Sequence, residues 1–230
     1  MIKEREKIME HKVVPALARL EQLLQCYPEL ECCRDEIIMS FNILQEAYRN
    51  GRKLLIAGNG GSAADSAHIA GELMKSFHFR RKPEPVLCRN LELCYGAAGQ
   101  TAADFLEGAL PAVALPEMMA LSTAYMNDAD PEGVFAQGVY GLGQQGDVLL
   151  AISTSGNSKN ILYACMTANV KGMKTIGLTG KSGGKMLGLC DCVICVPFTD
   201  TYRIQERHLP IYHALCAMLE AEFFDVGERV

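Results

Sequence analysis

The sequence predicts an α/β fold in which helices cover both faces of a parallel sheet. Five short apolar segments, several rich in β-branched residues, recur from residue 53 onward, and helical stretches separate most of them. Continuous apolar runs of this length are typical of strands that are buried on both faces. Strands that alternate with helices indicate the layered α/β class. The expected strands are 54–57, 112–115, 148–152, 175–178 and 192–196.

Residues 1–50 are expected to form a helical extension that precedes the α/β domain. Leucines at helical spacing between Leu17 and Leu24 predict one helix, and apolar residues at the same spacing between Ile37 and Tyr48 predict a second. We expect the pair to cover the sheet or to pack against another subunit.

The remaining domain, residues 51–230, contains one segment that departs from the alternation of strands and helices. Residues 84–109 contain Pro85, Gly96, Gly99 and Gly108, and they predict only a short helical piece around 101–106. We interpret the segment as an insertion between the first helix and the second strand. Connections of this length commonly act as lids or interface elements.

Composition excludes several classes of protein. Hydrophobic residues make up 49% and charged residues 21%, which is enough apolar material for a full core. The net charge of −5 argues against a nucleic-acid partner. No apolar run reaches the roughly 18–20 residues of a membrane helix, and the charged start leads into no signal-peptide core. Several of the ten cysteines lie in apolar runs, as buried thiols do, so a reducing cytoplasm is expected.

A glycine-rich turn follows the first expected strand, at residues 58–65, with the sequence Gly-Asn-Gly-Gly-Ser-Ala-Ala-Asp. Glycines allow a ligand to approach the backbone closely, and the start of the next helix favours an anion. Ser62 and Asp65 have the spacing of a capping box. A P-loop is excluded, and a dinucleotide site lacks its acidic second strand, so no nucleotide cofactor is expected. A glycine turn without a ligand stays possible.

A second turn, residues 153–158, follows the third expected strand and surrounds one glycine with hydroxyl groups. Hydroxyl groups and the free N–H groups of a helix start can bind a phosphate without a positively charged side chain. The alternative is a helix cap with spare serines. Two such turns at the carboxyl ends of strands in one sheet predict a phosphate site.

The expected helices carry a third group of polar side chains. His68 and Glu72 are four residues apart and share a helix face. Gln205 and His213 lie near the C-terminus. Imidazole, carboxylate and amide groups together can bind a metal ion or transfer protons, although a single helical histidine is more often structural.

These motifs together resemble the phosphoheptose isomerases of the sugar isomerase (SIS) superfamily. The resemblance covers residues 40–83 and 110–222, and it includes the Asn-Gly-Gly-Ser turn, the serine turn and the Arg-Ile-Gln-Glu motif at 203–206. It implies a flavodoxin-like three-layer sandwich, the SIS domain, usually a homotetramer with active sites at subunit contacts. It also implies the isomerisation of D-sedoheptulose 7-phosphate to D-glycero-D-manno-heptose 7-phosphate through an enediol, with one zinc ion per subunit.

The resemblance also implies roles for individual residues. Glu72 is the expected base and His213 the expected acid of the proton transfer. The implied zinc ligands are His68, Glu72, Gln205 and His213. The implied substrate contacts are Asn59, Gly60, Gly61, Ser62, Glu72, Asn127, Asp128, Ser153, Thr154, Ser155, Ser158 and Gln205.

Helix geometry adds a constraint to this ligand set. Gln205 and His213 are eight positions apart, which is about 12 Å along one straight helix. We therefore predict that the site is assembled across a subunit interface.

The chain departs from the family pattern at three places. Ser76 stands where the family has a basic residue, Ala129-Asp130-Pro131 follows the Asn-Asp pair, and residues 84–109 are inserted. These departures could reshape the sugar pocket. We therefore expect phosphate binding, with heptose as the sugar that the resemblance implies.

Two non-catalytic functions remain as alternatives. One SIS branch binds the replication initiator DnaA, and other SIS domains sense sugar phosphates. The acid and base side chains favour catalysis, because a binding scaffold has no chemical need for them.

Overall fold

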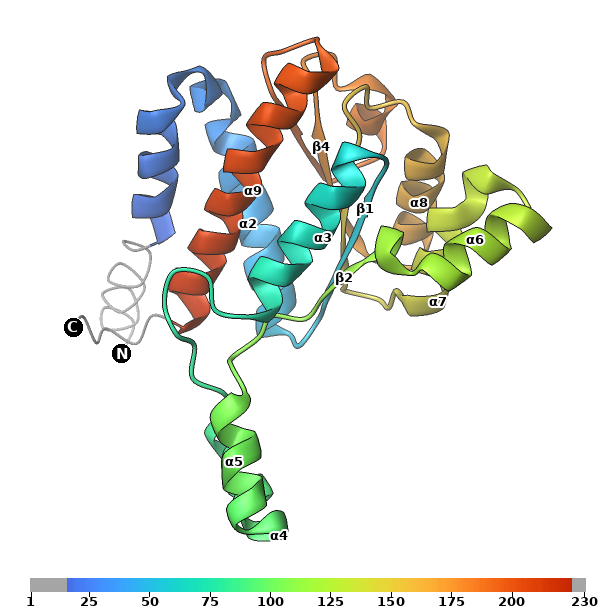
Figure 1. Cartoon of the computed structure of the whole chain (residues 1–230). Helices are drawn as coiled ribbons and strands as arrows, with labels where there is room; N and C mark the ends of the chain where they lie inside the picture. Colours follow the sequence, from blue (N-terminus) through green and yellow to red (C-terminus); the bar gives the residue numbers. More distant parts are fainter. Residues whose placement is uncertain (1–15, 225–230) are drawn as a thin grey trace.

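A five-stranded parallel sheet forms the centre of the computed structural model, which describes residues 16–224 (Figure 1). The charged start of the chain lies outside the described residues. The strand order is β2–β1–β3–β4–β5, which is the flavodoxin-like order, and the predicted fold class is therefore confirmed. The strands are β1 (Leu54–Gly58), β2 (Ala112–Ala114), β3 (Val148–Ile152), β4 (Lys174–Thr179) and β5 (Cys192–Cys195).

Helices cover both faces of the sheet and complete three layers. One face carries the helix over residues 16–26 together with α2 (Arg34–Arg49), α3 (Gly61–Met74) and α9 (Thr201–Phe224). The opposite face carries α7 (Val134–Leu142) and α8 (Lys159–Val170), with α6 (Met119–Asp128) beside them. Short 3-10 turns complete the chain: η1 (Pro28–Cys33), η2 (Leu115–Glu117), η3 (Pro131–Gly133) and η4 (Gly184–Gly188).

Alternation along the central strands builds two separate cores. Leu54 and Ile56 of β1 belong to the cluster under α3 and α9, whereas Leu55 and Ala57 belong to the cluster under α7 and α8. Every residue of β1 and of β3 is buried. The apolar runs are continuous because both faces of each central strand are covered.

The N-terminal helices pack into the same core as the sheet. Leu20 and Ile37 are fully buried in one cluster with Leu54. Gly51 ends α2 with φ +66°, and its N–H donates to the carbonyl of Tyr48 at 3.0 Å. The extension thus contributes to the hydrophobic interior of the α/β domain.

The inserted segment forms a helical hairpin of α4 (Pro85–Tyr95) and α5 (Ala97–Phe105), which projects from the body of the molecule (Figure 1). The sequence predicted only the second helix in part. A Cβ at Gly99 would lie 1.9 Å from the Leu91 carbonyl oxygen, so glycine is needed where the two helices meet. No residue of α4, all of which the structure describes, is buried.

Large apolar side chains of the hairpin face outward. Leu93 is 75% exposed, Tyr95 70% and Phe105 80%. These side chains contribute nothing to either core of their own chain.

Among the helices of residues 16–224, none has both the length and the apolar character that crossing a bilayer requires.

Candidate active site

The glycine turn after β1 leads directly into α3. Gly60 has φ +56° and allows the helix to begin at Gly61. The predicted cap by Ser62 is wrong: Ser62 is buried inside the first turn, and no side-chain cap forms at this helix start among the described residues. Asp65, the other half of the expected capping box, instead accepts a hydrogen bond from Tyr212.

In the part of the chain that the structure describes, the hydroxyl groups of the serine turn after β3 do not cap the helix that follows, α8. Ser153 and Ser158 share a hydrogen bond of 3.0 Å between their hydroxyl groups, and the Ser155 hydroxyl accepts from the Asn157 N–H at 3.2 Å. Ser158 precedes α8, but its side chain makes no cap bond within the described chain. This arrangement favours a ligand cradle over a helix cap with spare serines.

The two turns lie together at the carboxyl edge of the sheet. Asn59 and Asn160 exchange two side-chain amide hydrogen bonds of 3.0 and 2.9 Å, which join the glycine turn to the start of α8. Gln205 of α9 also reaches this edge, because a Cβ at Gly61 would lie 2.6 Å from its Nε2 atom. Glycine at 61 leaves room for the Gln205 amide to lie this close, and a Cβ there would displace that side chain.

Two predicted ligands and the predicted base meet further along α3. His68 Nε2 lies 3.4 Å from His213 Nε2 and 3.3 Å from a carboxylate oxygen of Glu72. Lys75 Nζ lies 3.3 Å from the other carboxylate oxygen. All of these contacts form within one chain, so this cluster does not need a second subunit.

Two residues that sequence reasoning missed orient the His68 ring, Tyr212 by direct contact and Asp65 through Tyr212. The Tyr212 hydroxyl donates to Asp65 Oδ1 at 3.2 Å and lies 3.1 Å from His68 Nδ1. Burial raises the pKa of the Asp65 carboxyl, and burial also raises the pKa of Tyr212. Tyr212 and Asp65 are 147 positions apart, and the only local signal was the place of Tyr212 beside His213.

The environment of His213 favours its neutral form. Burial lowers the pKa of His213, and the neighbouring His68 lowers it further, although Glu72 acts in the opposite direction. A neutral imidazole can bind a metal ion, accept a proton or polarise a carbonyl group through its N–H.

Other predicted residues lie apart from this cluster. Asn127 and Asp128 end α6, are exposed and bond to each other at 2.8 Å, and no hydrogen bond within residues 16–224 joins them to the other predicted residues. Gln205 lies beside Gly61, two turns of α9 before His213. No group of three or more His, Cys, Asp or Glu side chains in the described chain forms a preformed metal centre.

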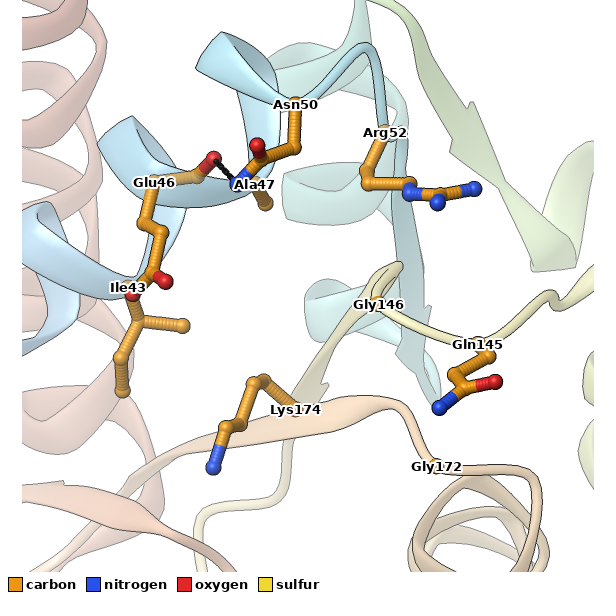
Figure 2. A pocket seen from close by; sticks show the side chains of 9 residues that line it. All are labelled: Ile43, Glu46, Ala47, Asn50, Arg52, Gln145, Gly146, Gly172 and Lys174. Carbon is orange, nitrogen blue, oxygen red and sulfur yellow. Dashed lines mark hydrogen bonds between the residues drawn. The ribbon is translucent and has the colours of Figure 1, made fainter.

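A cavity of about 550 Å³ opens at the opposite, amino edge of the sheet (Figure 2). Arg52, Gly146 and Lys174, at or just before the starts of three strands, contribute to its lining. Glu46 offsets part of the positive charge, and Lys174 is already paired with Asp191 at 3.1 Å. The cavity is thus separate from the polar cluster and lacks a concentrated charge for a ligand.

Comparison with known proteins agrees with the fold. Residues 89–180 match the SIS domain family. The chain is 39% identical to the phosphoheptose isomerase of a Nitratiruptor species over 94% of this chain and all of that protein. It is 41% identical to the phosphoheptose isomerase of Aneurinibacillus thermoaerophilus, over 78% of this chain and 77% of that protein.

A solved structure extends the comparison to three dimensions. The phosphoheptose isomerase GmhA of Neisseria gonorrhoeae superimposes with a TM-score of 0.63 at 30% identity, over 94% of this chain and 97% of that chain. The sequence identity over nearly the full length, together with the shared sheet, establishes that this chain belongs to the phosphoheptose isomerase family.

Proposed function

We propose that this chain catalyses the aldose–ketose isomerisation of D-sedoheptulose 7-phosphate to D-glycero-D-manno-heptose 7-phosphate. The contact of Glu72 and His213 with the same ring, that of His68, is the observation that carries the proposal. A carboxylate and an imidazole that contact one ring are within reach of a single substrate, which supports the proposal.

Each side chain would have a definite task. Glu72 would move a proton between C1 and C2 of the sugar, and His213 would donate a hydrogen bond and then a proton to the oxygen of the enediol. The serine turn would hold the phosphate and so position the reacting carbons. Asn59, Gly60, Gly61, Ser62 and Gln205 would contact the sugar from the glycine turn and α9. Asn127 and Asp128, from α6, are proposed contacts as well.

The chemistry of these donors also suits a zinc ion, although the described side chains form no preformed centre. Two ligand atoms on one tetrahedral zinc ion lie roughly 3.3–3.5 Å apart, given bonds of about 2.0–2.1 Å. The separations of 3.4 and 3.3 Å around His68 Nε2 agree with this value. His68, Glu72 and His213 would hold the ion, and Gln205 is the proposed fourth ligand. Zinc would polarise the substrate oxygens when bound.

We further propose that the protein is a cytoplasmic homo-oligomer, most simply a tetramer. The outward apolar side chains of the α4–α5 hairpin support this assembly, because they find no cover in their own chain. Subunit contacts could also bring further substrate-binding side chains to the cluster.

An assay of purified protein across seven-, six- and five-carbon ketose phosphates tests the function. We expect turnover of the seven-carbon substrate and a loss of at least about 100-fold in kcat for Glu72→Gln. Glu46→Gln, an exposed change at the amino edge, serves as the control. The same assay with an added chelator tests the zinc proposal, which expects turnover to fall.

The outcomes separate the alternatives. Turnover that is unaffected by Glu72→Gln would remove Glu72 as the base. An absence of turnover with tight sugar-phosphate binding would favour a sensor, and complex formation with DnaA would favour the initiator-binding function. The acid and base side chains and the isomerase relatives support catalysis over both.

A further inference from the structure

A fully buried ion pair lies behind the catalytic cluster. Arg81 Nε and Glu220 Oε1 are 2.8 Å apart, and both side chains have no exposed surface. Arg81 lies in the segment that follows α3, and Glu220 lies in the last two turns of α9. The pair therefore joins the segment that follows α3, the helix of Glu72, to α9, the helix of His213.

Arg81 binds the end of α3 through its other nitrogen atoms. Its Nη2 donates to the carbonyl of Glu72 at 2.9 Å, and its Nη1 donates to the carbonyl of Leu73 at 2.7 Å. The last carbonyl groups of a helix lack partners inside the helix, and a positive charge there is favourable. The guanidinium thus fixes the backbone from which the Glu72 side chain extends.

Glu220 forms the other half of this network. Its two carboxylate oxygens accept the backbone N–H groups of Phe77 and His78, each at 2.8 Å. The Phe77 ring lies beside the His213 ring, with centroids 5.7 Å apart. The carboxylate therefore fixes the segment that packs against His213.

We infer that Arg81 and Glu220 are positioning residues, which set the separation between the Glu72 carboxylate and the His213 imidazole. This inference rests on the proposed function of that pair. Burying two charges is costly, and an apolar pair would join the helices as well. An apolar pair could not bind two carbonyl groups and two N–H groups at once. The network makes those bonds around Glu72 and beside His213.

Arg81→Lys separates charge from geometry. Lysine keeps the positive charge but lacks the planar fork that reaches Glu220 and two carbonyl groups together. We expect a folded protein whose kcat for D-sedoheptulose 7-phosphate falls about 10- to 100-fold, with KM changed less than about twofold, because misplacement of a catalytic group affects chemistry more than phosphate binding.

Two further measurements complete the test. Lys53→Met disrupts another buried-carboxylate pair, Lys53–Asp147, at the amino edge, and we expect it to lower the unfolding temperature without lowering kcat. In substrate-free protein with ¹³C-labelled glutamate carboxyls, the Glu72 signal, assigned with Glu72→Gln, should shift in Arg81→Lys and stay in place in Lys53→Met. Glu220→Gln carries the same test if Arg81→Lys does not fold.

A folded Arg81→Lys variant with wild-type kcat and an unmoved Glu72 signal would overturn the inference. An equal loss of kcat in Lys53→Met would do so too, because it would trace the effect to stability alone. If the wild-type protein fails to isomerise the sugar, the proposed function fails, and the carboxyl signal decides the positioning role by itself.

Discussion

The hydroxyl group of Tyr212 lies between Asp65 Oδ1, at 3.2 Å, and Nδ1 of His68, at 3.1 Å. A hydroxyl group has one proton, and Tyr212 uses it to donate a hydrogen bond to the Asp65 carboxylate. Nδ1 of His68 must then carry a proton and donate it to Tyr212. In the neutral ring, Nε2 of His68 then has the lone pair, and this atom faces Glu72 and His213.

Tyr212→Phe should disturb this tautomer of His68. Partners of this kind typically contribute 10- to 100-fold to metal affinity or activity, and we expect a fall in kcat of about 10-fold. ¹⁵N NMR of the histidine rings should show a mixture of His68 tautomers in the variant. Tyr163→Phe, on the half-exposed face of α8, is the control. An unchanged ¹⁵N pattern would contradict the assignment.

Removing hydroxyl groups from the serine turn should weaken substrate binding. Ser153→Ala and Ser155→Ala each delete one donor to the phosphate, and a hydrogen bond to a charged group contributes about 1.5–3 kcal/mol. We expect KM to rise about 10-fold or more, with a smaller change in kcat. Steady-state kinetics measure both, with Ser122→Ala on α6 as control. A loss confined to kcat would argue against the phosphate-binding role.

Acid should destabilise the fold through His208. Neither ring nitrogen of this buried side chain has a hydrogen-bond partner in the described chain. Burial lowers its pKa from 6.5 to about 4, and the Thr179 backbone acts in the opposite direction. Between these values the unfolded chain binds the extra proton, so stability falls as the pH falls from about 6.5 to 4. Across this window the free energy of unfolding should fall by about 3 kcal/mol.

Urea unfolding of wild type and His208→Gln at several pH values measures this contribution. The free energy of unfolding of the variant should depend less on pH across this window. Parallel curves for the two proteins would show that His208 does not titrate in this way.

The α4–α5 hairpin should determine the oligomeric state. Leu93→Glu and Tyr95→Ser place polar groups on the exposed apolar face of the hairpin, and we expect a smaller particle by light scattering. Val170→Glu, at a 91% exposed position on α8, is the control. An unchanged mass in both hairpin variants would show that the interface lies elsewhere.

Local patterns were sufficient to predict the sheet and part of the site. The expected strands match β1 to β5 within a residue or two at each end, because strands buried on both faces leave continuous apolar runs. His68 and Glu72 were predicted to share a helix face, and their 3.3 Å contact agrees with that spacing.

Contacts between distant segments could not be predicted in this way. Arg81 and Glu220 are 139 positions apart, and neither residue belongs to a local motif. The Ser62 cap failed because the positive φ of Gly60 starts α3 two residues earlier than the capping pattern requires. α4 was missed although Leu87, Leu91 and Cys94 recur at helical spacing, because Pro85 and the following glycines favoured an irregular connection.

The two ends of the projecting hairpin meet where it joins the body. The N–H of Gly108 donates to the carbonyl of Arg81 at 3.2 Å, so the intervening residues leave and re-enter at one point. Because its two ends are adjacent, this insertion can be gained, lost or replaced by a short linker. The connection from β1 to β2 would keep its path in each case. Evolution could therefore alter how subunits associate without rebuilding the chemistry behind it.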